Sequence, residues 1–356
     1  MACRHLLLTT DAVGGVWQYS IDLAEALQPL GYETTLAVLG PPPSSAQRAR
    51  AGKLRLIETG LDLEWLASGP GAVLVTQREL ATLAGDLRAD AVQLHSPALI
   101  GANRFPCPVV AMLHSCVATW WTAVRGGPMP ADFAWRTDLV RQGLARATMG
   151  VAPSAAFAQA AMLHYGAAPQ VVYNGRALVA RPSPMQDFVF TAGRLWDEAK
   201  NVRQLARAAA GIPVPFKAAG PVRSPQGDVT GFDTLHLLGT LDEAALARAL
   251  GARPVFASAA LYEPFGLSVL EAASAGCALV LSDIPTFREL WGGAAVFVAP
   301  DDAKGFCAAI TSLIEDRAKR VAMGEVARDR ARRYSPAAMA QGMATLHARA
   351  QERNAA

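Results

Sequence analysis

The sequence has little cysteine, little charge and no long apolar run. Its five cysteines are scattered without any C-x-x-C spacing, which argues against a zinc site and a disulfide framework and fits a reducing compartment. Charged residues make up 18% of the chain, and the net charge of +3 is too small to suggest a nucleic-acid partner. The apolar run that follows residues 1–5 is too short for a signal peptide or a membrane span. We therefore expect a cytoplasmic globular protein, and 356 residues suggest two domains.

What the sequence does contain is a repeated alternation of strand and helix patterns. Residues 5–10 read as a strand, residues 16–30 as a helix and residues 35–39 as the next strand, with Gly14-Gly15 in the first turn. This turn lacks the third glycine of the dinucleotide fingerprint G-x-G-x-x-G, and on local grounds it could be only a tight turn. The second half restarts with a strand at residues 188–192. The pattern predicts an α/β protein with parallel sheets.

The stretch 254–288 is the most informative part of the chain. Two apolar strands, 254–258 and 278–282, flank a helix that begins near Leu267 and ends before Gly276. Glu263 precedes this helix and Glu271 lies inside it. The first amides of a helix have no internal partner and attract anions. On local grounds, however, Glu263 could only cap the helix and Glu271 could only decorate its surface.

The flanking residues carry a resemblance to a known family. The segment Glu263-Pro-Phe-Gly-Leu-Ser-Val-Leu-Glu271 resembles the E-x7-E motif of retaining glycosyltransferases of family GT4, which have the GT-B fold. Gly14-Gly15 is similar to the paired-glycine loop of that family, and Gly193-Arg194-Leu with Lys200 is similar to its pyrophosphate clamp. The resemblance implies two Rossmann-like domains facing across a cleft.

The resemblance also suggests the domain boundaries. Residues 171–175, Val-Val-Tyr-Asn-Gly, are similar to the V-x-P-N-G that ends the first domain of the family, with Tyr173 in place of proline. The following residues, 176–184, read as a linker. We expect an acceptor-side domain at residues 1–176, a donor-side domain at 177–334 and a C-terminal helix at 335–356 that crosses back to the first domain.

The family implies a role for each matching residue. Arg194, Lys200 and the helix start would stabilise the departing diphosphate in place of a metal, Glu271 would hold the ribose hydroxyls, and Glu263 would hold sugar hydroxyls. The expected catalytic residues are His114, Glu263, Arg194 and Lys200. The expected donor-binding residues are Gly14, Gly15, Arg194, Lys200, Leu238 in the nucleobase-reading segment, Glu263, Pro264, Phe265, Gly266, Leu267 and Glu271.

His95, Trp120 and Trp121 are the acceptor-side candidates, whereas the resemblance implies that His114 contacts the donor sugar. His95 ends the strand pattern 91–95, and His114 ends the pattern 108–114, so both are expected at the ligand-binding edge of one sheet. A lone histidine at a strand end is more often a satisfied structural residue, but two of them are expected at the same edge as Gly14-Gly15. Trp120 and Trp121 are expected in a mobile acceptor-side loop before Gly126, or else in the core, because indoles stack on sugars and also fill cores.

No D-x-D segment stands where a metal-dependent transferase needs one, so we expect no metal and no cofactor, with a nucleotide-diphosphate sugar as substrate. The acceptor, whether saccharide, lipid or small molecule, is not encoded in any motif. The arginine-rich helix at 316–333 could dock on an anionic membrane, but a solvated face is favoured. The alternatives are a GT-B sugar-nucleotide epimerase, a GT-B phosphorylase, which would need a lysine for pyridoxal phosphate, and a non-catalytic nucleotide-sugar-binding module.

Overall fold

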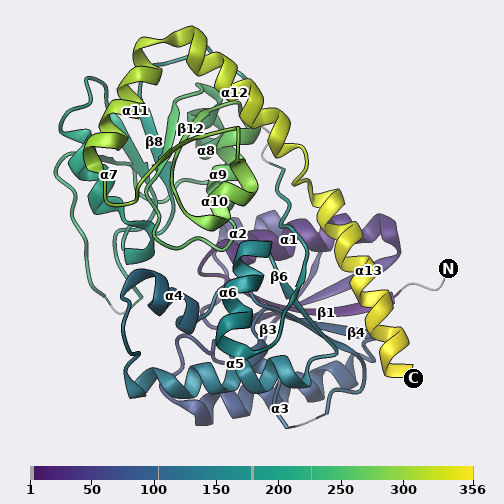
Figure 1. Cartoon of the computed structure of the whole chain (residues 1–356). Helices are drawn as coiled ribbons and strands as arrows, with labels where there is room; N and C mark the ends of the chain where they lie inside the picture. Colours follow the sequence, from purple (N-terminus) through teal and green to yellow (C-terminus); the bar gives the residue numbers. More distant parts are fainter. Residues whose placement is uncertain (1–3, 103, 178–179, 226, 356) are drawn as a thin grey trace. The chain divides into compact units, whose positions relative to one another are not determined.

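The chain forms two compact units, each with its own parallel sheet (Figure 1). The computed structural model describes residues 4–102, 104–177, 180–225 and 227–355. Unit 1 comprises Met1–Gly175 and Pro336–Ala356, and unit 2 comprises Arg176–Ser335. The expected linker at 176–184 includes residues 178–179, which lie outside the described residues. The predicted fold class, two Rossmann-like α/β domains, is confirmed.

Unit 1 is built on a seven-stranded sheet in the order β3-β2-β1-β4-β5-β6-β7, with all neighbours parallel. Its strands are β1 (Arg4–Asp11), β2 (Tyr32–Leu39), β3 (Arg55–Glu58), β4 (Ala91–Leu94), β5 (Val109–Met112), β6 (Met149–Ala152) and β7 (Gln170–Val171). The order reverses between β1 and β4. Open α/β sheets bind ligands beyond the carboxyl ends of the strands at such a reversal. Gly14-Gly15 follows β1 and His95 follows β4, so both lie at this point.

Helices cover the sheet of unit 1. They are α1 (Gly15–Leu27), η1 (Gln28–Leu30), α2 (Ser45–Ala51), α3 (Pro70–Asp86), η2 (Pro97–Leu99), α4 (Val117–Val124), η3 (Ala131–Phe133), α5 (Ala134–Arg146), α6 (Ala155–Tyr165) and α13 (Pro336–Ala355). The predicted helix at 16–30 ends as α-helix at Leu27, because Pro29 has no amide to donate and the last turn tightens to 3₁₀ form. Ser154 caps α6, since its side chain accepts a hydrogen bond from the Phe157 amide.

The C-terminal helix α13 belongs to unit 1, where it packs beside α1 (Figure 1). Its apolar face reaches the core of the unit through Met339, Met343 and Leu346, which pack with residues of α1 and of the sheet. The side chain of Val172 fills the space beside Gly342, where a Cβ would lie 3.0 Å from Val172 Cγ1. The last helix of the chain is thus part of the fold of the first unit.

Unit 2 repeats the same topology with a six-stranded sheet in the order β10-β9-β8-β11-β12-β13. Its strands are β8 (Val189–Ala192), β9 (Phe216–Ala219), β10 (His236–Leu237), β11 (Val255–Ser258), β12 (Ala278–Ser282) and β13 (Val296–Val298), and neighbouring strands are again parallel. The reversal lies between β8 and β11. The loop with Arg194 and Lys200 follows β8, and the segment with Glu263 follows β11. Two sequence-distant loops are therefore neighbours at one edge of the sheet.

The helices of unit 2 are η4 (Glu198–Lys200), α7 (Val202–Ala209), α8 (Glu243–Gly251), α9 (Leu267–Ser274), α10 (Pro285–Trp291), α11 (Ala303–Glu315) and α12 (Arg317–Ala331). Helix α9 ends as predicted, with Gly276 in the left-handed region at φ +80°. Strand β10 is short, because it pairs with β9 on one side only and forms the exposed edge of the sheet.

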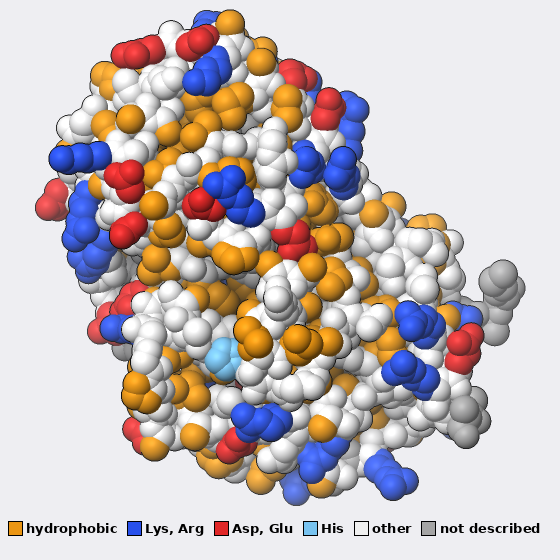
Figure 2. Space-filling model, in the orientation of Figure 1, with side chains coloured by type: hydrophobic (Ala, Val, Ile, Leu, Met, Phe, Trp, Pro, Cys, Tyr) orange, Lys and Arg blue, Asp and Glu red, His pale blue; other side chains and the backbone are white. Residues whose placement is uncertain are grey.

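The surface and the thiols agree with the composition. Basic and acidic side chains are interspersed over the face shown in Figure 2, as the small net charge suggests. Cys107, Cys116, Cys277 and Cys307 are free thiols, and Cys3 lies outside the described residues. Within the described part of the chain, no helix combines the length and the apolarity that crossing a membrane requires.

Candidate functional site

Glycines end the strands on one side of the unit 2 sheet. Gly193 follows β8, Gly220 follows β9 and Gly239 follows β10, all with positive φ. The Gly193 amide donates to Ala219 O at 3.0 Å, and the Gly220 amide donates to Gly239 O at 2.8 Å. A Cβ at Gly220 would lie 1.7 Å from Gly193 O, so only glycine fits between these loops. This edge of the sheet is therefore lined by main chain without side chains, beside the exposed Leu238.

Arg194 directly follows Gly193 and has a carboxylate partner. Its guanidinium donates to Asp197 Oδ2 at 2.8 and 3.3 Å, and 44% of its side chain is exposed. Burial acts to raise the pKa of the Asp197 carboxyl, but the charge and hydrogen bond of Arg194, with Lys200 and the Ala199 amide, hold that pKa below its ordinary value. Asp197 therefore stays ionised and orients Arg194.

Lys200 forms an ion pair with Glu263, and both side chains are largely buried. The next residue, Asn201, adopts the left-handed conformation at φ +51° and donates from Nδ2 to Ala259 O and Pro300 O at 3.0 and 2.8 Å. The Leu261 amide also donates to Ala199 O at 2.8 Å. The two loops are thus joined by main-chain and side-chain bonds, and Lys200 is less exposed than a surface loop would leave it.

The N-terminal end of α9 follows Glu263 directly. Gly266 adopts φ +91°, and a Cβ there would lie 3.2 Å from Glu263 Cγ. The Phe265 ring is buried and meets the Tyr334 ring edge-on at 5.6 Å, so only the main chain of Phe265 can reach a ligand. The amides of Leu267 and Ser268 begin the helix, and no acceptor for them is found in the described residues. This helix end carries the partial positive charge that favours an anion.

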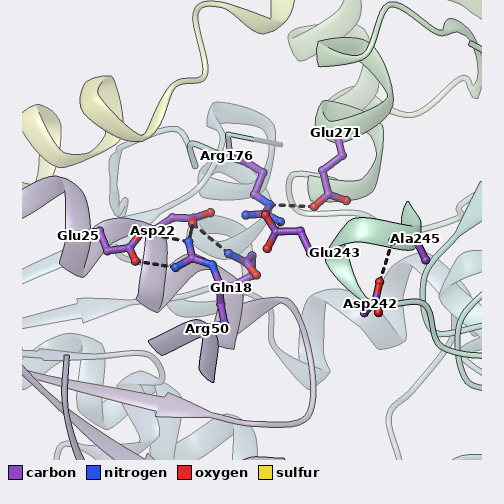
Figure 3. A network of polar contacts seen from close by, with 9 residues as sticks. All are labelled: Gln18, Asp22, Glu25, Arg50, Arg176, Asp242, Glu243, Ala245 and Glu271. Atoms are coloured by element: carbon purple, nitrogen blue, oxygen red, sulfur yellow. Dashed lines mark hydrogen bonds and ion pairs between the residues drawn. The ribbon is translucent and has the colours of Figure 1, made fainter. Parts of the chain in front are cut away.

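Glu271 lies one turn into α9 and is bound by an arginine that the motif does not contain (Figure 3). Arg176 Nε donates to Glu271 Oε1 at 2.8 Å, and Arg176 Nη2 lies 3.5 Å from Glu243 Oε2. The side chains of Arg176 and Glu271 are 3% and 11% exposed, so this is a buried ion pair. Glu271 is not the surface residue that local reasoning allowed.

In unit 1, the Gly14-Gly15 turn is shaped by Asp11. Its Oδ1 accepts hydrogen bonds from the amides of Val13 and Gly14 at 2.8 and 3.2 Å. Gly14 is extended, with φ −151°, and precedes the first residue of α1. A positive φ is therefore not the reason for glycine at this position.

His95 belongs to a buried hydrogen-bond chain. Gln93 Nε2 donates to His95 Nε2 at 3.1 Å, and Gln93 Oε1 accepts from His347 Nε2 of α13 at 3.0 Å. These partners assign the proton of His95 to Nδ1, which donates to Ser20 Oγ at 3.2 Å, and Ser20 donates to Val16 O at 2.7 Å. Both ring nitrogens of His95 are thus engaged within the protein. Burial, with the nearby His114, holds the pKa of His95 well below its ordinary value.

His114 lies against the same cluster but differs in its bonding. Its ring centroid is 4.8 Å from that of His95 and 4.5 Å from that of Tyr19. Its Nε2 is buried, and the described residues offer it no hydrogen-bond partner. Burial lowers the pKa of His114 to about 3, so the imidazole is neutral near pH 7. A neutral ring can donate or accept a hydrogen bond but brings no charge.

The tryptophans do not lie in a loop, and that prediction is wrong. Trp120 and Trp121 are in α4, because residues 117–124 contain no glycine or proline and the break comes only at Gly126 and Gly127, both with positive φ. The Trp121 ring lies 5.7 Å from the Phe133 ring. Both indoles are half-buried on a helix.

Two family models match this chain. The model of Glycosyltransferase Family 4 matches residues 13–178, and the model of Glycosyl transferases group 1 matches residues 186–316. Together with the two Rossmann-like units, these matches define a glycosyltransferase of GT-B fold. The first half of the chain thus matches Family 4, and the second half matches the group 1 glycosyltransferases.

Relatives match over nearly the whole chain. Phosphatidyl-myo-inositol mannosyltransferase of Mycolicibacterium smegmatis is 26% identical, covering 94% of this chain and 89% of its own. The structure of sucrose-phosphate synthase from Thermosynechococcus elongatus has a TM-score of 0.81 at 18% identity, covering 97% of this chain and 98% of its own. Anabaena HepE in complex with UDP-glucose has a TM-score of 0.77 at 18% identity, covering 96% and 98%. The two structures show that the fold is shared.

Sequence reasoning missed some of the residues that shape the site. Asp197 could have been noticed, because it stands three residues after Arg194, the spacing of many local ion pairs. Asp11 could also have been noticed, because an aspartate just ahead of a turn commonly accepts from the amides that follow it. Asn201 is a turn residue whose distant partners become visible only in the fold. Arg176 has no local signal at all, since Glu271 lies 95 residues further along the chain.

Proposed function

We propose that this glycosyltransferase transfers a sugar from a nucleotide-diphosphate sugar to an acceptor hydroxyl, with retention of anomeric configuration and without a metal ion. Unit 2 binds the donor. Arg194, Lys200 and the first amides of α9 take the diphosphate, Glu271 takes the ribose, and Glu263 takes hydroxyls of the transferred sugar. The segment around Leu238 lies against the nucleobase.

The observation that carries the proposal is the convergence of charges at the reversal of the unit 2 sheet. Lys200 and Glu263 are paired, and Glu263 immediately precedes the N-terminal end of α9. Arg194 follows β8, the neighbour of β11, beside the glycines that line this edge of the sheet. A diphosphate suits forked and point cations together with unpaired helix amides. The main chain at Gly193 and Gly239, where an added Cβ would meet no atom closer than 3.7 Å, lets a flat nucleoside approach closely.

The same groups support the proposal that no metal ion is needed. The diphosphate leaves with increased negative charge, and preorganised cations and amides in a partly buried site stabilise that charge strongly. The departing phosphate then deprotonates the acceptor hydroxyl that attacks on the same face of the sugar, which retains the configuration. This front-side step rests on the family resemblance.

The acceptor side is assigned to unit 1. His114, which by the family resemblance contacts the donor sugar, offers an uncharged ring, which suits a hydrogen bond to a sugar hydroxyl better than an ion pair with a phosphate. Trp120 and Trp121 offer half-buried apolar surface on α4. His95 supports this region structurally, because its two nitrogens are already bonded. The relatives differ in acceptor, since one is named for phosphatidyl-myo-inositol and another for sucrose phosphate, so the acceptor class stays open.

The donor is the first property to test. Thermal unfolding with UDP, GDP, ADP and their hexose derivatives should show a raised midpoint for one base, because a ligand that binds only the folded state stabilises it. HepE, solved with UDP-glucose, makes UDP the first candidate. Incubation with the sugar nucleotide and candidate acceptors should release the nucleoside diphosphate. If the sugar nucleotide alone is converted into an isomer, the activity is that of an epimerase, and if no nucleotide shifts the midpoint the proposal fails.

A further inference from the structure

None of the family motifs contains Arg176, so they do not explain its position in unit 2. It follows Asn174-Gly175 and precedes every strand of the second sheet, yet its side chain is 3% exposed. Its amide donates to Tyr334 O at 3.2 Å, close to the other end of the unit. The ring of Tyr334 meets Phe265, which stands just ahead of α9. Arg176 is therefore held by its main chain near the start of the helix that carries Glu271.

The side chain of Arg176 ends on Glu271, as Figure 3 shows. Its Nε donates to Glu271 Oε1 at 2.8 Å, and its Nη2 lies 3.5 Å from Glu243 on α8. Glu243 is the exposed partner, with 42% of its side chain accessible, whereas the side chain of Glu271 is 11% exposed. Burying a carboxylate is costly unless a cation pairs with it, and Arg176 supplies that cation for Glu271.

Building on the proposed function, we propose that Arg176 is a positioning residue for the ribose site. It turns the Glu271 carboxylate so that the lone pairs not used by the guanidinium can accept the ribose hydroxyls. A carboxylate has about four lone-pair directions, so a bond to Arg176 Nε and bonds to a vicinal diol are compatible. A guanidinium holds a carboxylate at a defined angle better than a lysine can, because its donors form a rigid fork.

This role differs from a general contribution to folding in one measurable way. If Arg176 orients Glu271, its loss weakens the recognition of the ribose hydroxyls selectively, and the preference for a ribonucleotide over its deoxy counterpart falls. A purely structural role lowers stability without changing that preference. A direct contact with the diphosphate weakens ribo- and deoxynucleotides equally.

The test measures dissociation constants by calorimetry for UDP, GDP and ADP and for their 2′-deoxy forms, with wild type, Arg176→Met, Arg176→Lys and Glu271→Gln. For the base that binds, wild type should prefer the ribonucleotide by about tenfold, the size expected for one charge-assisted hydrogen bond. Arg176→Met should reduce this preference to about twofold or less, and Arg176→Lys should keep an intermediate value, because it retains the charge without the fork.

The double variant Arg176→Met/Glu271→Gln guards against loss of folding, because it removes both charges of the buried pair together. Its ribose preference should equal that of Glu271→Gln alone, since Arg176 acts through Glu271. Arg328→Met is the matched control, because Arg328 is an arginine of the same unit paired with Glu325 on the exposed face of α12. It should bind like wild type.

Three other results would each contradict a different part of the proposal: the positioning role of Arg176, the ribose assignment of Glu271, or the proposed function. If Arg176→Met keeps the wild-type preference, or if its effect adds to that of Glu271→Gln, the positioning role is wrong while the donor site stands. If wild type binds a nucleoside diphosphate without preferring ribose, the ribose assignment of Glu271 is wrong, and the role of Arg176 falls with it. If wild type binds none of the nucleotides, the proposed function itself is wrong.

Discussion

Lys200 and Glu263 form an ion pair that joins the loop after β8 to the segment after β11. The two residues are 63 positions apart in the chain and meet because their strands are neighbours in the sheet. A cation and a carboxylate are therefore assembled beside the start of α9 before any donor binds. Removing either one leaves the other partly buried without its partner, and this relationship shapes the first two predictions.

Arg194→Ala and Lys200→Ala should each weaken nucleoside-diphosphate binding by about 1.5–3 kcal/mol, the size of a lost charge-assisted bond. Both variants should also lower the free energy of unfolding, because Arg194 pairs with the buried Asp197 and Lys200 pairs with the largely buried Glu263. Calorimetric titration and denaturant unfolding measure the two effects. Lys319→Ala, on α12, is the control and should change neither. Unchanged nucleotide affinity in both variants contradicts the diphosphate assignment.

The two glutamates should separate by role. Glu271→Gln should weaken binding of both the bare nucleoside diphosphate and the sugar nucleotide, because its contacts are with the ribose. Glu263→Gln should spare the bare nucleotide and lower turnover, because its contacts are with a sugar on which charge develops in the transition state. Titration with nucleoside diphosphate, beside the turnover number, distinguishes them. Normal turnover in Glu263→Gln, or unaltered nucleotide binding in Glu271→Gln, shows that the roles are misassigned.

EDTA should leave the transferase activity largely intact. The reason is that Arg194, Lys200 and the helix amides surround the diphosphate and stabilise it directly. The measurement compares initial rates of nucleoside-diphosphate release before and after chelation, with a dialysed sample as control. Full loss of activity that magnesium or manganese restores means that a metal ion takes part in the reaction.

Gly220→Ala should destabilise unit 2 strongly. The added Cβ would lie 1.7 Å from Gly193 O, in a backbone conformation with φ +135°, so a cost of about 3 kcal/mol or more is expected. The matched control is Gly239→Ala, where φ is +65° but no atom lies within 4 Å of the new Cβ. It should cost only about 1–2 kcal/mol, the strain of a left-handed alanine. Equal losses in denaturant unfolding argue against close packing of these loops.

Acid should destabilise unit 1 through its buried histidines. Burial, with a contribution from Arg4, lowers the pKa of His347 to about 4. Because this folded-state pKa lies below the unfolded value, His347 stabilises the fold above about pH 6.5, and that stability is lost as the pH falls towards 4. Glu64 acts in the opposite sense, since burial raises its pKa to about 7 and its contribution is lost as the pH rises through that value.

The variant His347→Gln isolates the histidine effect. The loss of unfolding free energy between pH 7 and pH 5 should be smaller in this variant than in wild type by about 1–2 kcal/mol. His236→Gln is the control, because His236 is exposed on the short edge strand β10. It should keep the wild-type dependence. An identical pH dependence in His347→Gln indicates that His347 titrates alike in the folded and unfolded chain.

Local features were readable from the sequence because their causes lie within a few residues. The alternation of apolar strands and amphipathic helices predicts two parallel sheets, and Gly276 marks the end of a helix because glycine readily adopts the left-handed conformation there. The family motifs predicted which loops matter, and the order of strands then places Lys200 opposite the start of α9. The tryptophans were misplaced because an eight-residue helix is too short to leave a clear periodic pattern.

Only the tertiary structure decided which groups meet. Arg176 and Glu271 are 95 residues apart in the chain, and His347 and Gln93 are 254 residues apart. No local sequence pattern therefore predicts either pair. These contacts depend on strand register and on where a helix end or a domain terminus settles, and both are set by burial of the whole core. The sequence determined by itself that this is a glycosyltransferase with two nucleotide-type folds. The fold decided that its central carboxylates are buried and held by partners, because a buried charge persists only where the packing brings an opposite charge.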